Sequence, residues 1–140
     1  METEKLVELA FEAKKRSYSP YSHFAVGAAL LTKDGKVYQG CNIENAAFTP
    51  TNCAERTAFF KAVYEGETEF EAIAIAGGPN DGRPYDSYCS PCGVCLQVMM
   101  EFCDPNSFKV ILTRNLKEYK TCTLKELIPS GFGPADLREE

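Results

Sequence analysis

Three cysteines and one glutamate stand in two short segments at a spacing that suits metal chemistry. Cys53 is followed two residues later by Glu55, and Cys92 and Cys95 stand three residues apart after Pro91. Zinc takes four tetrahedral positions, and a catalytic zinc site uses three protein ligands and leaves one position for water. Three thiolates from these two segments would therefore suffice to hold one Zn²⁺ per chain at a catalytic site.

Glu55 is the candidate proton carrier beside that metal. A bound zinc ion lowers the pKa of its water to about 7, and a carboxylate that is not itself a ligand can accept the proton of that water. A glutamate in a first helical turn often does no more than complement the helix dipole. The cysteines nearby favour the catalytic interpretation of Glu55.

Cys89 offers an alternative ligand pair, because it too stands three residues from Cys92. Pro91 disfavours helical backbone in the residue before it, so we place Cys89 on a loop and prefer Cys92 and Cys95 as the pair on one helical turn. A structural zinc site closed by His23 or Cys89 is the second reading. A redox-active dithiol at 92–95 is the third and leaves the Cys53 segment unexplained.

Helices and strands are expected to alternate around these residues. Apolar residues recur at helical spacing over 2–16, 53–65 and 91–103, and a capping-box pattern at 123–126 indicates a short last helix. Strand-like runs cover 24–32, a stretch from residue 37, 70–76, 108–112 and 118–122. Cys53 and Cys92 then stand at helix N-termini, which stabilise thiolates. The order predicts one α/β domain over residues 1–140, with a mixed five-stranded sheet in three α/β/α layers.

Composition limits the partners of the chain. The 140 residues carry a net charge of -5, which disfavours the phosphate backbone of a nucleic acid as a partner. The apolar runs are too short for a membrane span, and residues 1–5 lack the apolar stretch of a signal peptide. Seven cysteines, an odd number, favour metal binding over a disulfide framework. We therefore expect a cytoplasmic protein with reduced thiols, no nucleic-acid partner and no membrane attachment.

The cysteine motifs carry a family resemblance. The sequence Cys53-Ala54-Glu55, followed by Pro91-Cys92-Gly93-Val94-Cys95, resembles the signature of zinc-dependent deaminases. Residues 21–30, 40–46 and 53–58 are similar to the corresponding blocks of the small cytidine deaminases. These blocks extend the resemblance over nearly the whole chain.

The resemblance implies a reaction and a substrate site. It implies that zinc-dependent hydrolysis converts cytidine and deoxycytidine to uridine and deoxyuridine with release of ammonia, as a step of pyrimidine salvage, and that Glu55 donates protons to the base and the leaving amine. Phe24 would stack on the base, Asn42 and Glu44 would bind the ribose hydroxyls, and the backbone of Ala54 would contact the base. The alternatives are a same-fold deaminase of a cytosine-containing antibiotic nucleoside and a non-catalytic structural zinc module.

The resemblance also implies a homotetramer whose pockets are completed by neighbouring subunits. Phe132 from the tail and the loop from Ala46 to Phe48 would cross over to neighbouring subunits. The chain departs from the family pattern at Leu96, where an arginine often follows the last ligand, and at Phe48, where a tyrosine is frequent. Arg56 then remains as the positive side chain able to donate to the ligand sulfurs.

Overall fold

A computed structural model describes residues 1–137 of the chain. The expected domain over 1–140 includes residues 138–140, which lie outside the described residues. The elements follow the chain in this order: α1 (Thr3–Lys14), β1 (Phe24–Thr32), β2 (Val37–Cys41), α2 (Ala54–Tyr64), β3 (Phe70–Pro79), α3 (Gly93–Phe102), β4 (Lys109–Thr113), β5 (Tyr119–Thr123), α4 (Leu124–Leu127) and a 3₁₀ turn at Pro134–Leu137.

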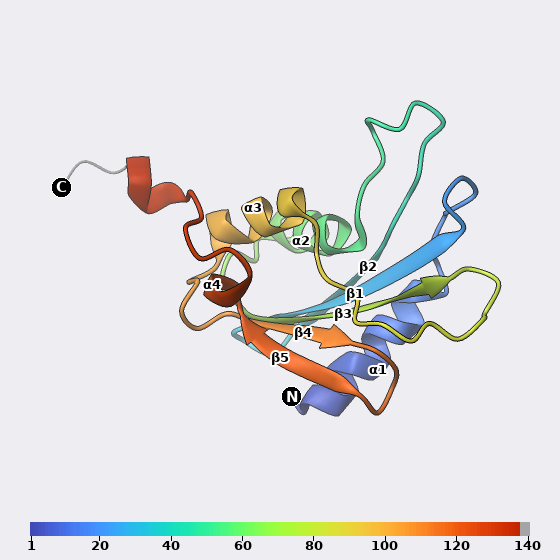
Figure 1. Cartoon of the computed structure of the whole chain (residues 1–140). Helices are drawn as coiled ribbons and strands as arrows, with labels where there is room; N and C mark the ends of the chain where they lie inside the picture. Colours follow the sequence, from blue (N-terminus) through green and yellow to red (C-terminus); the bar gives the residue numbers. More distant parts are fainter. Residues whose placement is uncertain (138–140) are drawn as a thin grey trace.

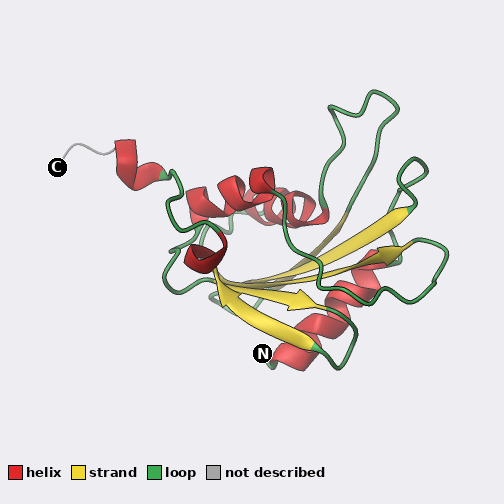
Figure 2. Cartoon of the chain, viewed as in Figure 1, coloured by secondary structure: helices red, strands yellow, loops and turns green. Residues whose placement is uncertain are grey.

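The five strands form one mixed sheet in the order β2-β1-β3-β4-β5. β3 and β4 pair in parallel, and the other neighbouring strands are antiparallel. The parallel pair needs a crossover, which the 80–92 loop and α3 supply. Helices α2 and α3 cover one face of the sheet, and α1 covers the other (Figures 1 and 2). The predicted three-layer α/β/α arrangement is therefore confirmed.

The strands divide their side chains between two apolar cores with a period of two residues. Leu30, Ile75 and Leu112 belong to the core beneath α2 and α3. Leu31 and Ile111, each next in the chain to a residue of the first core, pack in the core against α1. Because both faces of the central strands are covered, the sequences of these strands are continuously apolar.

Most element boundaries lie within two residues of those predicted from the sequence. β3 is the clear difference, because it runs to Pro79 where the prediction ended the strand at residue 76. Pairing with β1 explains the extension, since Gly77 and Gly78 stand opposite Val26 and Ala25. The predicted capping box is present at Thr123 and Glu126. None of the helices within residues 1–137 combines the length and apolar character that a membrane span requires.

The first turn of α2 lies unusually close to β2. A Cβ added to Gly40 would fall 2.5 Å from both the Ala54 carbonyl oxygen and the Ala58 amide nitrogen. These are backbone atoms of α2 and cannot rotate away, so the glycine is required for this approach. Gly40 therefore sets how closely the N-terminus of α2, with Cys53 before it, lies on the sheet.

Candidate metal and catalytic site

The three predicted ligand cysteines meet at the N-termini of α2 and α3. Cys53 is the N-cap of α2 and Cys92 the N-cap of α3. Their sulfurs lie 3.7 Å apart, and the Cys92 and Cys95 sulfurs lie 3.6 Å apart. All three sulfurs lie within 4.8 Å of one another, the one such candidate metal-ligand group found among residues 1–137. Three soft donors at this spacing fit a zinc ion.

Contacts within the cluster favour the thiolate form of Cys53, and the contact with Cys53 raises the pKa of Cys95. The Cys95 amide donates to the Cys92 sulfur at 3.5 Å. A hydrogen bond with Cys95, aided by the Arg56 guanidinium, lowers the pKa of Cys53 to about 5. Pro91 stands one residue before the N-cap and outside the helix, although the sequence suggested it as the helix start. Because the proline ring fixes the backbone angle φ, Pro91 still ends the loop directly before Cys92.

Glu55 lies in the first turn of α2 with its side chain almost fully buried, at 4% exposure. Burial is the largest cause that raises the pKa of Glu55, to about 7, and the neighbouring Cys53 charge raises it further. A buried carboxyl group next to a cluster of possible metal ligands is a typical arrangement for proton transfer. The structure therefore brings Glu55 and the cysteine cluster together, as the sequence predicted.

Arg56 bridges from α2 to the ligand sulfurs. Its Nη2 donates to the Cys53 sulfur at 3.3 Å. Hydrogen bonding to Cys53 is also the largest cause that raises the pKa of Arg56. A cation here offsets the negative charge that three thiolates would place on one metal. Leu96, which directly follows Cys95 in the chain, packs against the apolar core.

Cys89 lies on the loop before α3, as predicted, and its thiol is directed into the protein. A Cβ at Gly77 would come within 2.6 Å of the Cys89 sulfur, so this thiol packs on bare backbone of β3. Burial raises the pKa of Cys89 to about 12. The Cys89 sulfur lies outside the group of three sulfurs that could hold a metal.

Phe24, the first residue of β1, lies next to Gly77 together with Cys89. A Cβ at Gly77 would lie 3.1 Å from the Phe24 ring, and the Tyr85 ring stands edge-on to it with centroids 5.0 Å apart. Sequence reasoning did not identify Tyr85, because it stands in a loop whose path the chain pattern does not define. Phe24 and Cys89 both pack against Gly77 of β3. The charge of Glu55 also contributes to the raised pKa of Cys89, so this end of the sheet is near the Glu55 carboxyl group.

Asn42 and Glu44 follow β2 and are already engaged in hydrogen bonds. Asn42 Oδ1 accepts from the Val26 amide at 2.9 Å and from the Ser17 hydroxyl, and Asn42 Nδ2 donates to the Phe24 carbonyl at 2.8 Å. Both acceptor positions of Asn42 Oδ1 are thereby used. One N–H of its amide group remains for a ligand.

Glu44 shows the complementary pattern. Its Oε1 accepts from the amides of Tyr21 and Ser22 at 2.9 and 3.1 Å, and its Oε2 accepts from the Ser22 hydroxyl. Burial opposes ionisation, but these hydrogen bonds prevail and lower the pKa of Glu44. Oε2 keeps one acceptor position. Sequence reasoning missed the partners Ser17 and Ser22, which carry no signal beyond their place in the turn before β1.

Three of the remaining predicted residues are exposed and lie on two separate segments. Phe48 is 70% exposed in the long loop between β2 and α2, and Ala46 lies in the same loop. Phe132 is 54% exposed, and its carbonyl accepts from Gln97 of α3. The loop and the tail project from opposite ends of the molecule (Figure 1). Ala54, by contrast, begins α2 and is fully buried.

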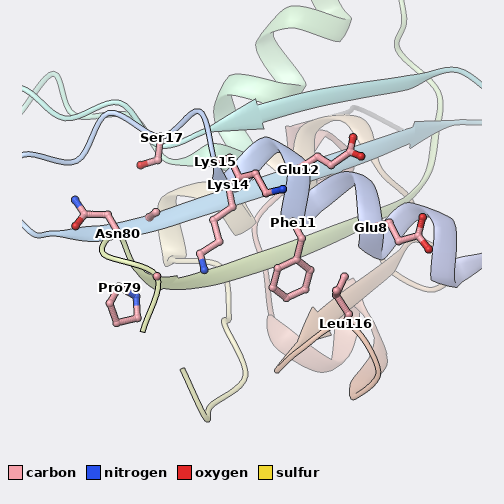
Figure 3. A pocket seen from close by; sticks show the side chains of 11 residues that line it. Glu8, Phe11, Glu12, Lys14, Lys15, Ser17, Pro79, Asn80 and Leu116 are labelled. Carbon is pink, nitrogen blue, oxygen red and sulfur yellow. The ribbon is translucent and has the colours of Figure 1, made fainter. Parts of the chain in front are cut away.

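A separate cavity of about 630 Å³ opens between α1 and the end of β3. Figure 3 shows the Phe11 ring and the Lys14 side chain directed into it, with Leu116 nearby. Its lining includes none of the predicted site residues. This cavity is therefore distinct from the site around the cysteine cluster.

The chain is similar to known proteins along nearly its whole length. Residues 1–111 match the family model described as the cytidine and deoxycytidylate deaminase zinc-binding region. The cytidine deaminase of Sporosarcina psychrophila is 46% identical over 98% of this chain and 96% of the relative. That of Halalkalibacterium halodurans is 44% identical over 99% and 100%. The crystal structure of cytidine deaminase from Burkholderia pseudomallei superposes with a TM-score of 0.84 at 42% identity, covering 94% of this chain and 100% of that one.

Proposed function

Because this chain belongs to the cytidine and deoxycytidylate deaminase family, we propose that it hydrolyses cytidine and deoxycytidine to uridine and deoxyuridine with release of ammonia. The observation that carries this function is the buried Glu55 beside three clustered thiols. A structural zinc module needs no such carboxyl group, because its metal is enclosed by four ligands and activates no water.

Cys53, Cys92 and Cys95 hold one Zn²⁺ per chain. Their spacing and their places at two helix N-termini fit the ion, as described above. When bound, zinc supplies a water of lowered pKa as the nucleophile for hydrolysis. Arg56 keeps the Cys53 sulfur in its thiolate form through the contact at 3.3 Å.

Glu55 moves the protons of the reaction. Its carboxyl group takes one proton from the attacking water and passes it to N3 of the cytosine ring. It then takes the second proton, from the hydroxyl group formed at the ring carbon, and passes it to the leaving amine, which departs as ammonia. The surrounding core excludes bulk water from this group. Exclusion of solvent keeps the proton available to the substrate.

Phe24, Asn42 and Glu44 form the substrate side of the site. The Phe24 ring stacks on the base, and the Ala54 backbone contacts the base edge. Asn42 has one free N–H, and Glu44 Oε2 has one free acceptor position. A sugar hydroxyl both accepts and donates, so it is matched by this donor and acceptor pair. The pattern suits a free nucleoside.

Assembly into a homotetramer completes the pocket. Ala46, Phe48 and Phe132 serve the pockets of neighbouring subunits, which accounts for aromatic rings on projecting segments. The surface of α2 supports association, since Phe60 and Tyr64 are 50% and 88% exposed. Aromatic side chains gathered on a surface are typical of interfaces. Pyrimidine salvage in the cytoplasm is the setting proposed for this enzyme.

The test is a direct assay of the zinc-loaded protein with cytidine. We expect the absorbance of cytidine to change to that of uridine, with one ammonia released for each uridine formed. A protein that binds one zinc per chain and folds normally, yet leaves cytidine unchanged over a wide concentration range, would overturn the assignment of cytidine as substrate.

A further inference from the structure

The turn between α1 and β1 contains a serine that links the sugar side of the proposed site to its base side. Phe24 N donates to Ser22 Oγ at 3.1 Å, and Ser22 Oγ donates to Glu44 Oε2. The Phe24 carbonyl is a weaker alternative acceptor for the same hydroxyl, at 3.5 Å. Since a hydroxyl has one proton and a carboxylate is the stronger acceptor, the proton of Ser22 goes to Glu44.

The backbone of the turn is shaped for this link. His23 stands between Ser22 and Phe24 with φ of 58°, in the left-handed region that few side chains adopt. The His23 amide donates to the Ser19 carbonyl at 3.1 Å, and the Asn80 amide donates to the His23 carbonyl at 2.8 Å. These bonds hold the strained residue in place. The Ser22 hydroxyl then reaches the amide two residues later.

Glu44 gains its orientation from the same turn. The amides of Tyr21 and Ser22 both donate to Oε1, and the Ser22 hydroxyl donates to Oε2. The two amide bonds fix one oxygen of the carboxylate. The bond from Ser22 Oγ fixes the rotation of the carboxylate plane, and with it the direction of the remaining acceptor position on Oε2.

We propose that Ser22 is a positioning residue that orients the Glu44 carboxylate toward a sugar hydroxyl and couples it to the Phe24 backbone. The inference rests on the proposed function, in which Glu44 binds the sugar and the Phe24 ring stacks on the base. In this role Ser22 acts through Glu44 and the Phe24 backbone.

Kinetics of Ser22→Ala test this role, with Ser22→Thr as the rescue variant. Loss of one hydrogen bond to a charged group predicts about a tenfold rise in KM for cytidine. We expect kcat to stay within about twofold, because the lost interaction binds ground state and transition state alike. Ser22→Thr keeps a hydroxyl at an exposed position and should restore the KM. Ser107→Ala, at another exposed turn serine, is the matched control and should behave as the unaltered chain.

A second substrate separates positioning from a purely structural role. Dideoxycytidine carries the same base but lacks the 2′ and 3′ hydroxyls, so Ser22→Ala and the unaltered chain should process it with equal kcat/KM. In a Glu44→Ala background, Ser22→Ala should add no further change, because the carboxylate that it orients is gone. Equal losses on both nucleosides, or a fall in kcat alone, would instead show that Ser22 supports the fold around Phe24.

Failure of the inference differs from failure of the proposed function. If Glu44→Ala raises KM for cytidine but not for dideoxycytidine, while Ser22→Ala changes neither, the sugar role stands and the role of Ser22 is refuted. If Glu44→Ala affects both nucleosides equally, Glu44 does not bind the sugar, and the role of Ser22 is refuted although deamination of cytidine stands. If the zinc-loaded unaltered chain deaminates neither nucleoside, the proposed function itself fails.

Discussion

Arg56 Nη2 donates to the Cys53 sulfur across 3.3 Å, from one turn further along α2. The contact joins a permanent cation to one of the three clustered sulfurs. We expect Arg56→Gln, which keeps a donor but removes the charge, to weaken zinc binding about 10- to 100-fold, as for other residues that support metal ligands. Competition with a chromogenic chelator measures this affinity.

Arg83→Gln is the matched control for that experiment. Arg83 pairs with Asp81 on an exposed loop, at 2.7 Å, and its side chain is 74% exposed. An exposed pair of this kind contributes little. Equal zinc affinity of the two variants would show that the charge of Arg56 has no part in holding the metal.

Substitution of Glu55 tests the proposed proton transfer. Glu55→Gln has nearly the same shape as the native side chain but cannot carry the proton, so we expect kcat for cytidine to fall by about 10²- to 10⁴-fold or more. Zinc content should stay at one per chain, since the carboxyl group is no ligand in the proposed site. Glu101→Gln, on the exposed side of α3, serves as the control. Retained turnover in Glu55→Gln would assign proton transfer to another group.

Cys89 and Cys92 distinguish the two possible ligand pairs. Cys89→Ala should retain one zinc per chain, because this thiol packs against Gly77 and lies outside the cluster of three sulfurs. Cys92→Ala should lose most of the zinc. Metal analysis of the purified variants measures both. Zinc that disappears with Cys89→Ala while its fold is intact would mean that the ligand set contains Cys89.

The sequence predicts the scaffold because its signals are local. Apolar runs at 24–32 and 70–76 mark strands that are covered on both faces, and the capping-box pattern at 123–126 marks a helix start. The cysteine spacing likewise predicts a shared helical turn at Cys92 and Cys95, since three residues nearly complete one turn. These features need no knowledge of distant residues.

What the sequence does not predict depends on tertiary pairing. β3 continues through Gly77 and Gly78 because β1 lies opposite, although glycines normally weaken a strand. The links of Ser17 to Asn42 and of Ser22 to Glu44 join residues more than 20 positions apart, and serines in a turn give no sign of such partners. The same holds for Cys89, whose burial depends on the missing side chain at Gly77.

The separation between Phe132 and the loop carrying Phe48 leads to a prediction about shared pockets. Both aromatic rings are exposed. The segments that carry them, the loop between β2 and α2 and the C-terminal tail, lie on opposite sides of the molecule (Figure 1). If Phe132 stacks on substrate in a neighbouring subunit, Phe132→Ala should lower kcat/KM about tenfold, in line with the loss of one aromatic stacking contact. Its melting temperature should change little, because the ring is half exposed.

Mixed assemblies test whether Phe132 acts across subunits. Chains carrying Glu55→Gln and chains carrying Phe132→Ala are produced together in equal amounts, so that they assemble at random. About a quarter of the pockets then combine an intact Glu55 with an intact Phe132 from a neighbour, and activity should approach a quarter of that of the unaltered protein. Mixing after separate assembly is the control and should give only the average of the two variants. If the activity of the co-produced sample never exceeds this average, Phe132 belongs to the pocket of its own chain or to no pocket. In either case the exchange of subunits creates no pocket with both an intact Glu55 and an intact Phe132 that did not exist before.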